Sequence, residues 1–332
     1  MRKAQPQFPG HEQPHVPTEL GYYDLRHAQV RAAQADLARA HGIHGFCYYH
    51  YWFGGRRVLE GPFEEVLRSG APDFPFCLCW ANENWTRRWD GLEREVLLAQ
   101  QYSPADDAAH FRALLPAFRD PRYIRVNGRP LFLVYRISRL PDPSATLARW
   151  RSLAREAGLP GLYVCNVESF PEEHSLAPRV GLDAAVEFGP DWGALPRPIA
   201  RGRRGALLWW LRRMRPRPEG YLRHHVARYE DLARNMMRKP APDYVRFPGL
   251  TPMWDNTARR RTDAVILQGS SPAAYEAWLR FCAERAAALP PEERFVFINA
   301  WNEWAEGNHL EPCERWGRRY LEATRRVIGG AC

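Results

Sequence analysis

The chain has 332 residues, of which 45% are hydrophobic and 13% aromatic, and its formal net charge is +9. This length suffices for one large core, and the sequence has no run of about 20 apolar residues that would span a membrane. Arginine carries almost all of the positive charge, which is spread along the chain without a nucleic-acid-binding motif, so we expect no nucleic-acid partner.

Short apolar runs alternate with amphipathic stretches along the chain. In chain order, the expected elements are a helix over 27–41, a strand over 43–53, a helix over 62–69, a strand over 74–80, a helix over 104–118, a strand over 131–135, a helix over 143–157, strands over 162–167 and 184–188, a helix over 221–237, an interrupted strand over 247–254, a helix over 272–288, a strand over 295–301 and a closing helix over 315–327. This alternation predicts an α/β fold, a parallel sheet covered by helices, in one domain over 1–332. Polar and aromatic residues cluster after the strand ends, where parallel barrels place their active sites.

The seven cysteines are odd in number and lie mostly within apolar runs, which predicts buried thiols in a reducing compartment. We therefore expect a cytoplasmic location. The sequence has neither the Cys/His spacing of a zinc site nor a glycine-rich phosphate-binding motif, so we expect no metal and no cofactor.

One segment, 199–218, departs from the alternation. Arginines flank an apolar stretch that contains Trp209 and Trp210, a pattern typical of a helix at a membrane interface. In that case the segment would give peripheral contact with a membrane or a lipid-linked glycan. An exposed inserted loop whose aromatic side chains pack on the sheet explains the pattern equally well.

Glu303 and Glu306 follow the last predicted strand. Glycosidic-bond chemistry needs a proton donor and a second group at the anomeric centre, and two carboxyls supply both. The two side chains lie on one side if the chain turns helically here, and on opposite faces if it stays extended. Gly307 allows a sharp change of direction afterwards. Surface glutamates in a loop are the alternative. The flanking residues expected to bind substrate are Trp301, Asn302 and Trp304.

Three further clusters combine aromatic rings with amides or charged groups after strand ends. Aromatic rings have an apolar face on which a sugar can stack, while amides and carboxylates hydrogen-bond to hydroxyls. In simpler interpretations the amides cap loops, the histidine is structural and the arginines form a solvated charge run. The candidate substrate-binding residues are Tyr49, His50 and Tyr51, then Trp80, Asn82, Glu83 and Trp85, and finally Trp254, Asp255, Asn256 and Arg260.

In combination these segments resemble the WbsX-like glycosyltransferases, which belong with the glycoside hydrolase family 99-like domains. The resemblance is carried by segments 10–14, 20–24, 45–53, 80–85, 254–257 with Arg260, 299–307 and 310–312. It implies a (β/α)8 TIM-type barrel and a role in bacterial surface-polysaccharide or O-antigen biosynthesis. The expected cytoplasmic location and a peripheral position on the inner membrane rest instead on the thiols and on segment 199–218.

The hydrolase members of this group are endo-acting α-mannosidases, whose two motif glutamates match Glu303 and Glu306. By resemblance, Glu303 is the base that deprotonates the substrate 2-hydroxyl, which then attacks the anomeric carbon. Glu306 is the acid that protonates the leaving oxygen and then activates water, so we expect its pKa to be raised. The implied partners are an oligosaccharide or lipid-linked glycan and, for a transferase, a sugar-nucleotide donor. Hydrolysis and transfer both stay open, and a non-catalytic glycan-binding barrel is the alternative from another class.

The family normally begins with a strand that this sequence lacks, because residues 1–6 lead almost directly into the motif at 10–14. Together with the seven strand signals, this predicts a barrel without its first strand at a truncated N-terminus.

Overall fold

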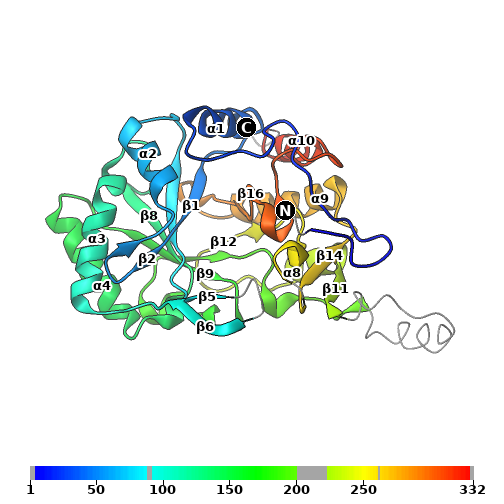
Figure 1. The fold of residues 1–332 in the computed structure, drawn as a ribbon. Helices are drawn as coiled ribbons and strands as arrows, with labels where there is room; N and C mark the ends of the chain where they lie inside the picture. Colours follow the sequence, from blue (N-terminus) through cyan, green and yellow to red (C-terminus); the bar gives the residue numbers. More distant parts are fainter. Residues whose placement is uncertain (1–3, 88–91, 200–222, 261, 330–332) are drawn as a thin grey trace.

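The computed structural model describes residues 4–87, 92–199, 223–260 and 262–329 (Figure 1). The strands of the central sheet are β1 (Phe46–His50), β4 (Phe76–Trp80), β8 (Arg129–Val134), β9 (Tyr163–Glu168), β10 (Ala184–Glu187), β12 (Arg246–Phe247), β13 (Gly249–Leu250) and β15 (Phe297–Ile298). The first six pair in parallel in the order β1-β4-β8-β9-β10-β12. Only Pro248 separates β12 from β13, and β13 pairs in parallel with β15. The seven strands predicted from the sequence are therefore present and parallel.

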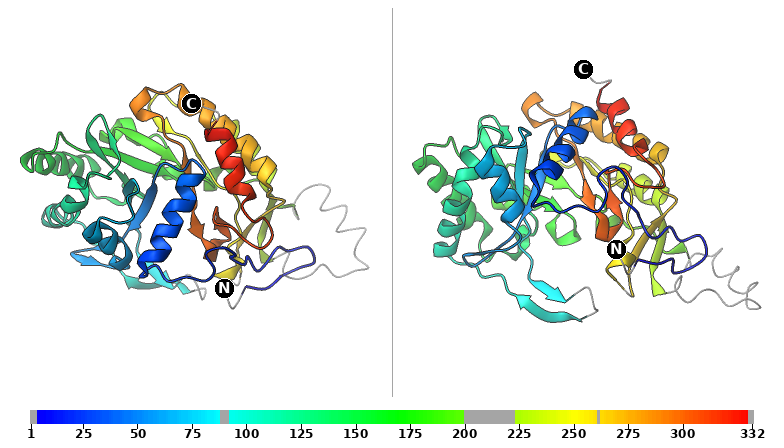
Figure 2. Two further views of the ribbon diagram at one scale, coloured as in Figure 1. Left: turned by 90° about the horizontal axis from the view of Figure 1, so that it is seen from above. Right: turned by 45° about the horizontal axis from the view of Figure 1, so that its top comes forward.

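Helices surround this sheet (Figure 1). They are α1 (Ala28–Ala40), α2 (Gly61–Ser69), α3 (Pro104–Arg119), α4 (Pro143–Glu156), α5 (Ala177–Val180), α8 (Tyr229–Met237), α9 (Pro272–Ala287) and α10 (Arg319–Ile328). Both views of Figure 2 show α9 and α10 side by side. Ser103 caps α3, because its side chain accepts a hydrogen bond from the Asp106 N–H ahead of Pro104.

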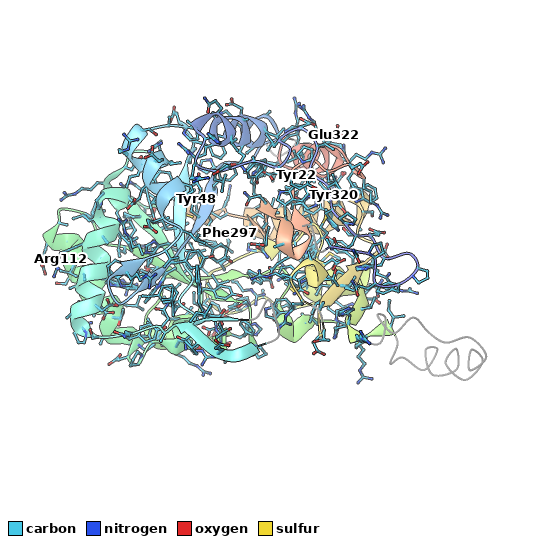
Figure 3. The ribbon with its side chains drawn as sticks, in the orientation of Figure 1. Tyr22, Tyr48, Arg112, Phe297, Tyr320 and Glu322 are labelled. Carbon is cyan, nitrogen blue, oxygen red and sulfur yellow. The ribbon has the colours of Figure 1, made fainter. Side chains whose placement is uncertain are left out.

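Aromatic residues fill the interior of the sheet. The Phe247 ring stacks on Tyr163 and on Phe297, with centroid distances of 6.1 Å in both cases, and Phe297 lies near the centre of the molecule (Figure 3). The cysteines that the structure describes are all free, and only Cys47 among them is not fully buried, which confirms the prediction of buried thiols.

No backbone pairing joins β15 to β1 in the described part of the chain, so a closed barrel is not detected. Side chains contact each other across this gap instead, where the Phe46 ring lies 5.3 Å from that of Trp301. The parallel strand order and the surrounding helices are consistent with a TIM-type barrel.

β7 (Arg125–Val126) joins the central sheet by pairing antiparallel with β8. Several short strands lie outside this sheet: β2 (Trp52–Phe53), β3 (Arg56–Arg57), β5 (Trp85–Arg87), β6 (Leu92–Leu98), β11 (His225–Arg228), β14 (Val265–Gln268), β16 (Asn302–Glu303) and β17 (Asn308–His309). The predicted helix over 221–237 is wrong at its start, since β11 occupies part of that range. β11 pairs in parallel with β14, whose β-branched Val265 and Ile266 favour a strand. Within segment 199–218, the residues after Ile199 lie outside the described ranges.

Candidate active site

The two motif glutamates lie on a short loop directly after the last strand of the sheet. β16 and β17 pair antiparallel and enclose a 3-10 turn over Trp304–Glu306. Residues three apart eclipse each other in such a turn, so Glu303 and Glu306 project to the same side. Gly307 then adopts a left-handed backbone with φ +54°, and a Cβ there would lie 2.7 Å from the Asp255 carbonyl oxygen. The predicted sharp change of direction at Gly307 is confirmed.

One guanidinium faces both carboxyls. Arg259 Nη1 lies 3.0 Å from Glu306 Oε1 and 4.0 Å from Glu303 Oε1. The sum of these distances puts the two Oε1 atoms within about 7 Å of each other, which admits the separations found in both retaining and inverting glycosidases. Glu303 and Glu306 therefore share one site.

Of the two motif carboxyls, Glu303 has a raised pKa, whereas the raised pKa expected at Glu306 stays a prediction. Burial raises the pKa of the Glu303 carboxyl, and the nearby charge of Arg259 partly opposes this rise. The side chain nevertheless keeps 45% of its surface open to water. Glu303 is therefore accessible from solvent, and a ligand that covers it would desolvate its carboxyl further.

Several tyrosines lie near the acidic loop that carries Glu303 and Glu306. Tyr49 is 45% exposed, although burial among its neighbours raises its pKa well above the usual value, and its ring lies 6.2 Å from that of Tyr135. Burial, followed by the charge of Glu303, raises the pKa of Tyr51 to about 12. Burial also raises the pKa of Tyr135, with contributions from the charges of Glu83 and Glu306. The acidic loop thus faces phenol groups that stay protonated at neutral pH.

The aromatic wall continues from Tyr135 to residues that the sequence did not single out. The Tyr135 ring lies 6.4 Å from that of Phe170, which in turn lies 6.3 Å from the ring of Trp192. Trp192 contacts Trp254 edge-on at 5.3 Å. Each of these follows the end of a strand, which is the only signal by which Tyr135, Phe170 and Trp192 could have been found from the sequence.

A buried cation organises the loop after β4. Arg136, which is 3% exposed, donates hydrogen bonds to Glu83 at 2.8 Å, Glu172 at 2.6 Å and Glu173 at 2.9 Å. The Asn82 carboxamide bonds to both the N–H and the carbonyl of Arg136. Glu83 is therefore held in place at the edge of the site, whereas Asn82 is fully used within the protein and does not bind substrate as we expected.

Two other residues predicted to bind substrate are buried in the core. Trp80 is 1% exposed and packs on His110 and Trp150, so the expectation that its ring stacks on a sugar is wrong. His50 is 8% exposed and its Nε2 lies 2.9 Å from that of His110. Burial lowers the pKa of His50 to about 4, so this histidine is neutral and structural. In contrast Trp85, edge-on to Tyr51 at 5.2 Å, lies beside the site.

The motif at 254–257 supports the acidic loop through a backbone hydrogen bond. Trp254, Asp255 and Asn256 are all buried. The Asp255 N–H donates to the Glu306 carbonyl at 2.8 Å, and the Asn256 side chain accepts from the Val265 N–H. These three side chains keep little exposed surface, and their predicted contact with substrate stays a prediction.

Arg260, the arginine that the resemblance pointed to, donates to the Asp263 carbonyl. The preceding residue, Arg259, faces the two carboxyls. Nothing in the sequence distinguishes it from Arg260 as the arginine of the site. Among the described residues no cluster of His, Cys, Asp or Glu is suited to hold a metal ion.

The residues that flank the glutamates hold the loop. Trp304 donates its indole N–H to Glu311 at 2.7 Å and stacks on His309 at 3.8 Å. Glu311 is 2% exposed and also accepts hydrogen bonds from Tyr23 at 2.8 Å and Gln34 at 2.7 Å. The Asn302 side chain donates to the Tyr23 hydroxyl, while Trp301 packs against Phe46. These contacts fix the position of Glu303 and Glu306.

Solved structures with a similar parallel α/β fold include glycoside-hydrolase-like proteins. A protein described as glycoside hydrolase-like aligns with a TM-score of 0.65, 13% identity and coverage of 96% of this chain and 90% of its own. The GH99 endo-alpha-mannosidase from Bacteroides thetaiotaomicron aligns with a TM-score of 0.54 and 15% identity over 99% of this chain and 91% of its own. At these identities the likeness concerns the fold.

Residues 1–324 match the family Glycosyltransferase WbsX, and the chain belongs to this family. It is 43% identical over 330 residues to uncharacterized proteins WxcX from two strains of Xanthomonas campestris pv. campestris. The alignment covers 99% of this chain but 45% of each relative, so the chain spans less than half the length of these curated relatives.

Proposed function

We propose that this chain forms or cleaves an α-glycosidic, mannoside-like bond in bacterial surface-polysaccharide or O-antigen biosynthesis. The observation that carries the proposal is the pair Glu303 and Glu306, which share Arg259 and lie near the phenol of Tyr51. Membership of the WbsX family and the fold shared with an endo-alpha-mannosidase support this substrate class.

In the proposed reaction Glu303 is the base. A raised pKa makes its carboxylate a better proton acceptor near neutral pH than an ordinary glutamate. It takes the proton of the substrate 2-hydroxyl, and that oxygen attacks the anomeric carbon while the leaving oxygen departs with a proton from Glu306. A water or an acceptor hydroxyl then gives its proton to Glu306 and opens the strained ring, and Glu303 returns the first proton to the 2-oxygen. Water as the second reactant gives hydrolysis, and a sugar hydroxyl gives transfer.

Arg259 sets a condition on this sequence of steps. Glu306 must carry a proton to act as the acid, but a guanidinium at 3.0 Å favours the ionised carboxylate. Substrate binding must therefore separate Arg259 from Glu306 before the leaving oxygen can be protonated.

Other side chains around the proposed site suit recognition of a glycan. Tyr49, Tyr135 and Trp192 offer ring faces for sugar stacking, and Glu83 offers a carboxylate to sugar hydroxyls. The partners in this proposal are an oligosaccharide or lipid-linked glycan and, for transfer, a sugar-nucleotide donor. The proposed setting is cytoplasmic and peripheral to the inner membrane. Among the described residues, no helix has the length and apolar character needed to cross a bilayer.

The test uses Glu303→Gln, Glu306→Gln and the matched control Glu322→Gln, which alters an exposed carboxyl on α10. Each protein is incubated with α-linked manno-oligosaccharides, alone and with sugar-nucleotide donors, and products are separated by mass. We expect the two site variants to lose turnover by about 10²–10⁴-fold, the usual contribution of a positioned acid or base, while Glu322→Gln stays active. Near-native rates in both site variants would refute the proposal. Glycan binding by the unaltered protein without turnover on any substrate would identify a non-catalytic glycan-binding domain.

A further inference from the structure

A cavity of about 360 Å³ is lined in part by Asp255, whose N–H holds the acidic loop at the Glu306 carbonyl. Its walls are residues 11–16, 253–255, 266–268 with Ser270, and 313–316. Figure 1 shows the N-terminal segment passing beside β14 and α10, where these walls meet. The volume lies within the range of small-molecule sites, and the walls do not include Glu303 or Glu306.

The walls of this cavity are fixed to each other. His11 Nε2 lies 2.6 Å from Asp255 Oδ2, and both side chains are buried. The Glu314 N–H donates to the Val16 carbonyl, and Arg315 forms an ion pair with Glu12 at 2.5 Å. The N-terminal segment is thus tied to two of the three other walls, and the cavity is formed before any ligand binds.

The lining combines ring faces with neutral hydrogen-bonding groups. Trp316 is half-buried in the wall, and Gln268 carries a half-exposed carboxamide without a protein partner in the described ranges. The Gln13 carboxamide approaches the Asp255 carbonyl at 3.4 Å, longer than a typical hydrogen bond. An indole face suits the C–H face of a sugar ring, and carboxamides both donate to and accept from sugar hydroxyls.

The charge of the lining selects against anions. Burial alone would raise the pKa of Asp255, but the hydrogen bond and charge of His11 outweigh it and hold this pKa below its usual value. Asp255 is therefore ionised, and the three carboxylates of Asp255, Glu12 and Glu314 outnumber the two cations of the lining, His11 and Arg315. Because burial lowers the pKa of His15, this histidine adds no positive charge at neutral pH. A phosphate or a sugar nucleotide would meet net negative walls.

We propose that this cavity is a second carbohydrate-binding site, which holds one neutral hexose unit of a glycan. The expectation that the hexose is an α-mannoside rests on the proposed function, whereas the preference for a neutral sugar rests on the lining alone. The cavity shares Asp255 with the catalytic side, because the Asp255 N–H holds the Glu306 carbonyl at 2.8 Å. A glycan retained here is thereby kept next to the acidic loop.

The test follows the indole N–H signal of Trp316 by NMR, assigned with Trp316→Phe, during titration with methyl α-D-mannoside. We expect a saturable shift with the unaltered protein. Gln268→Ala removes one neutral hydrogen-bonding group and should raise the Kd about tenfold. Gln29→Ala, which removes an exposed carboxamide on α1, should not change it. Because Glu303→Gln alters the other site, it should abolish turnover and leave this titration unchanged.

Three results would overturn the proposal. The Trp316 signal does not shift with the mannoside, the Kd is the same in Gln268→Ala, or α-D-mannose 1-phosphate binds at Trp316 more tightly than the neutral sugar. A normal titration in a protein that turns over no glycan would refute the proposed function and leave the second site standing.

Discussion

Arg259 should control the pH range over which Glu303 works as a base. At 4.0 Å, two unit charges interact by about 1 kcal/mol in water and about 4 kcal/mol at the effective permittivity near a protein surface. The Arg259 and Glu303 side chains are 41% and 45% exposed, so the value for water applies, and salt reduces it further. An interaction of about 1 kcal/mol changes the proton affinity of Glu303 roughly fivefold. In Arg259→Gln the pKa of Glu303 should therefore rise above its already raised value.

The sign of the effect follows from the role of Glu303. A base acts in its ionised form, so activity falls as the pH drops through its pKa, and a higher pKa moves this acidic limb to higher pH. The pH dependence of kcat/KM measures the limb, and NMR titration of a carboxyl-labelled glutamate measures Glu303 without turnover. Arg112→Gln on α3, which lies on the far side of the fold, is the control (Figure 3). An acidic limb that stays in place or moves to lower pH in Arg259→Gln would refute the electrostatic reasoning.

Three further predictions concern the supports of the site and the basic segment. Gly307→Ala should lower the free energy of unfolding in urea by about 1–3 kcal/mol, because the backbone is left-handed there and the new Cβ would press on the Asp255 carbonyl; an unchanged midpoint would contradict this. Glu311→Ala leaves the buried Gln34 and the partly buried Tyr23 and Trp304 without their acceptor and should cost about 3 kcal/mol in the same assay, with a cost below 1 kcal/mol arguing against the network. If 199–218 is an interfacial helix, joint replacement of Trp209 and Trp210 by Ala should reduce co-sedimentation with anionic liposomes, and an unchanged result would indicate a plain insertion.

The sequence was sufficient for features that depend on local pattern. Strand–helix alternation located the seven parallel strands, and the turn at Glu303–Gly307 followed from residue spacing and from one glycine. β14 was missed, and β11 was predicted as part of a helix. Each strand is only four residues long, and its pairing partner lies forty positions away in the sequence. Such a pairing leaves no periodic signal within either segment.

The sequence could not separate residues that touch a ligand from residues that hold those residues in place. Trp80, Asn82 and His50 stand next to strand ends just as Tyr49 and Glu83 do, but their side chains point into the core. Which way a side chain points depends on where each strand ends relative to its neighbours, and a shift by one residue turns it to the other face. The motif residues therefore include both accessible side chains, such as Tyr49 and Glu83, and core side chains, such as Trp80.

The same distinction explains why the N-terminal segment matters for a site that lies near the C-terminus. His11 binds the carboxyl of Asp255, whose N–H holds Glu306, and Tyr23 binds Glu311, which holds Trp304. Both ends of the acidic loop are thus fixed by residues almost three hundred positions away, and neither contact depends on pairing between β1 and β15. The loop that carries Glu303 and Glu306 is consequently positioned by side-chain contacts even where the sheet itself is not hydrogen-bonded into a closed ring.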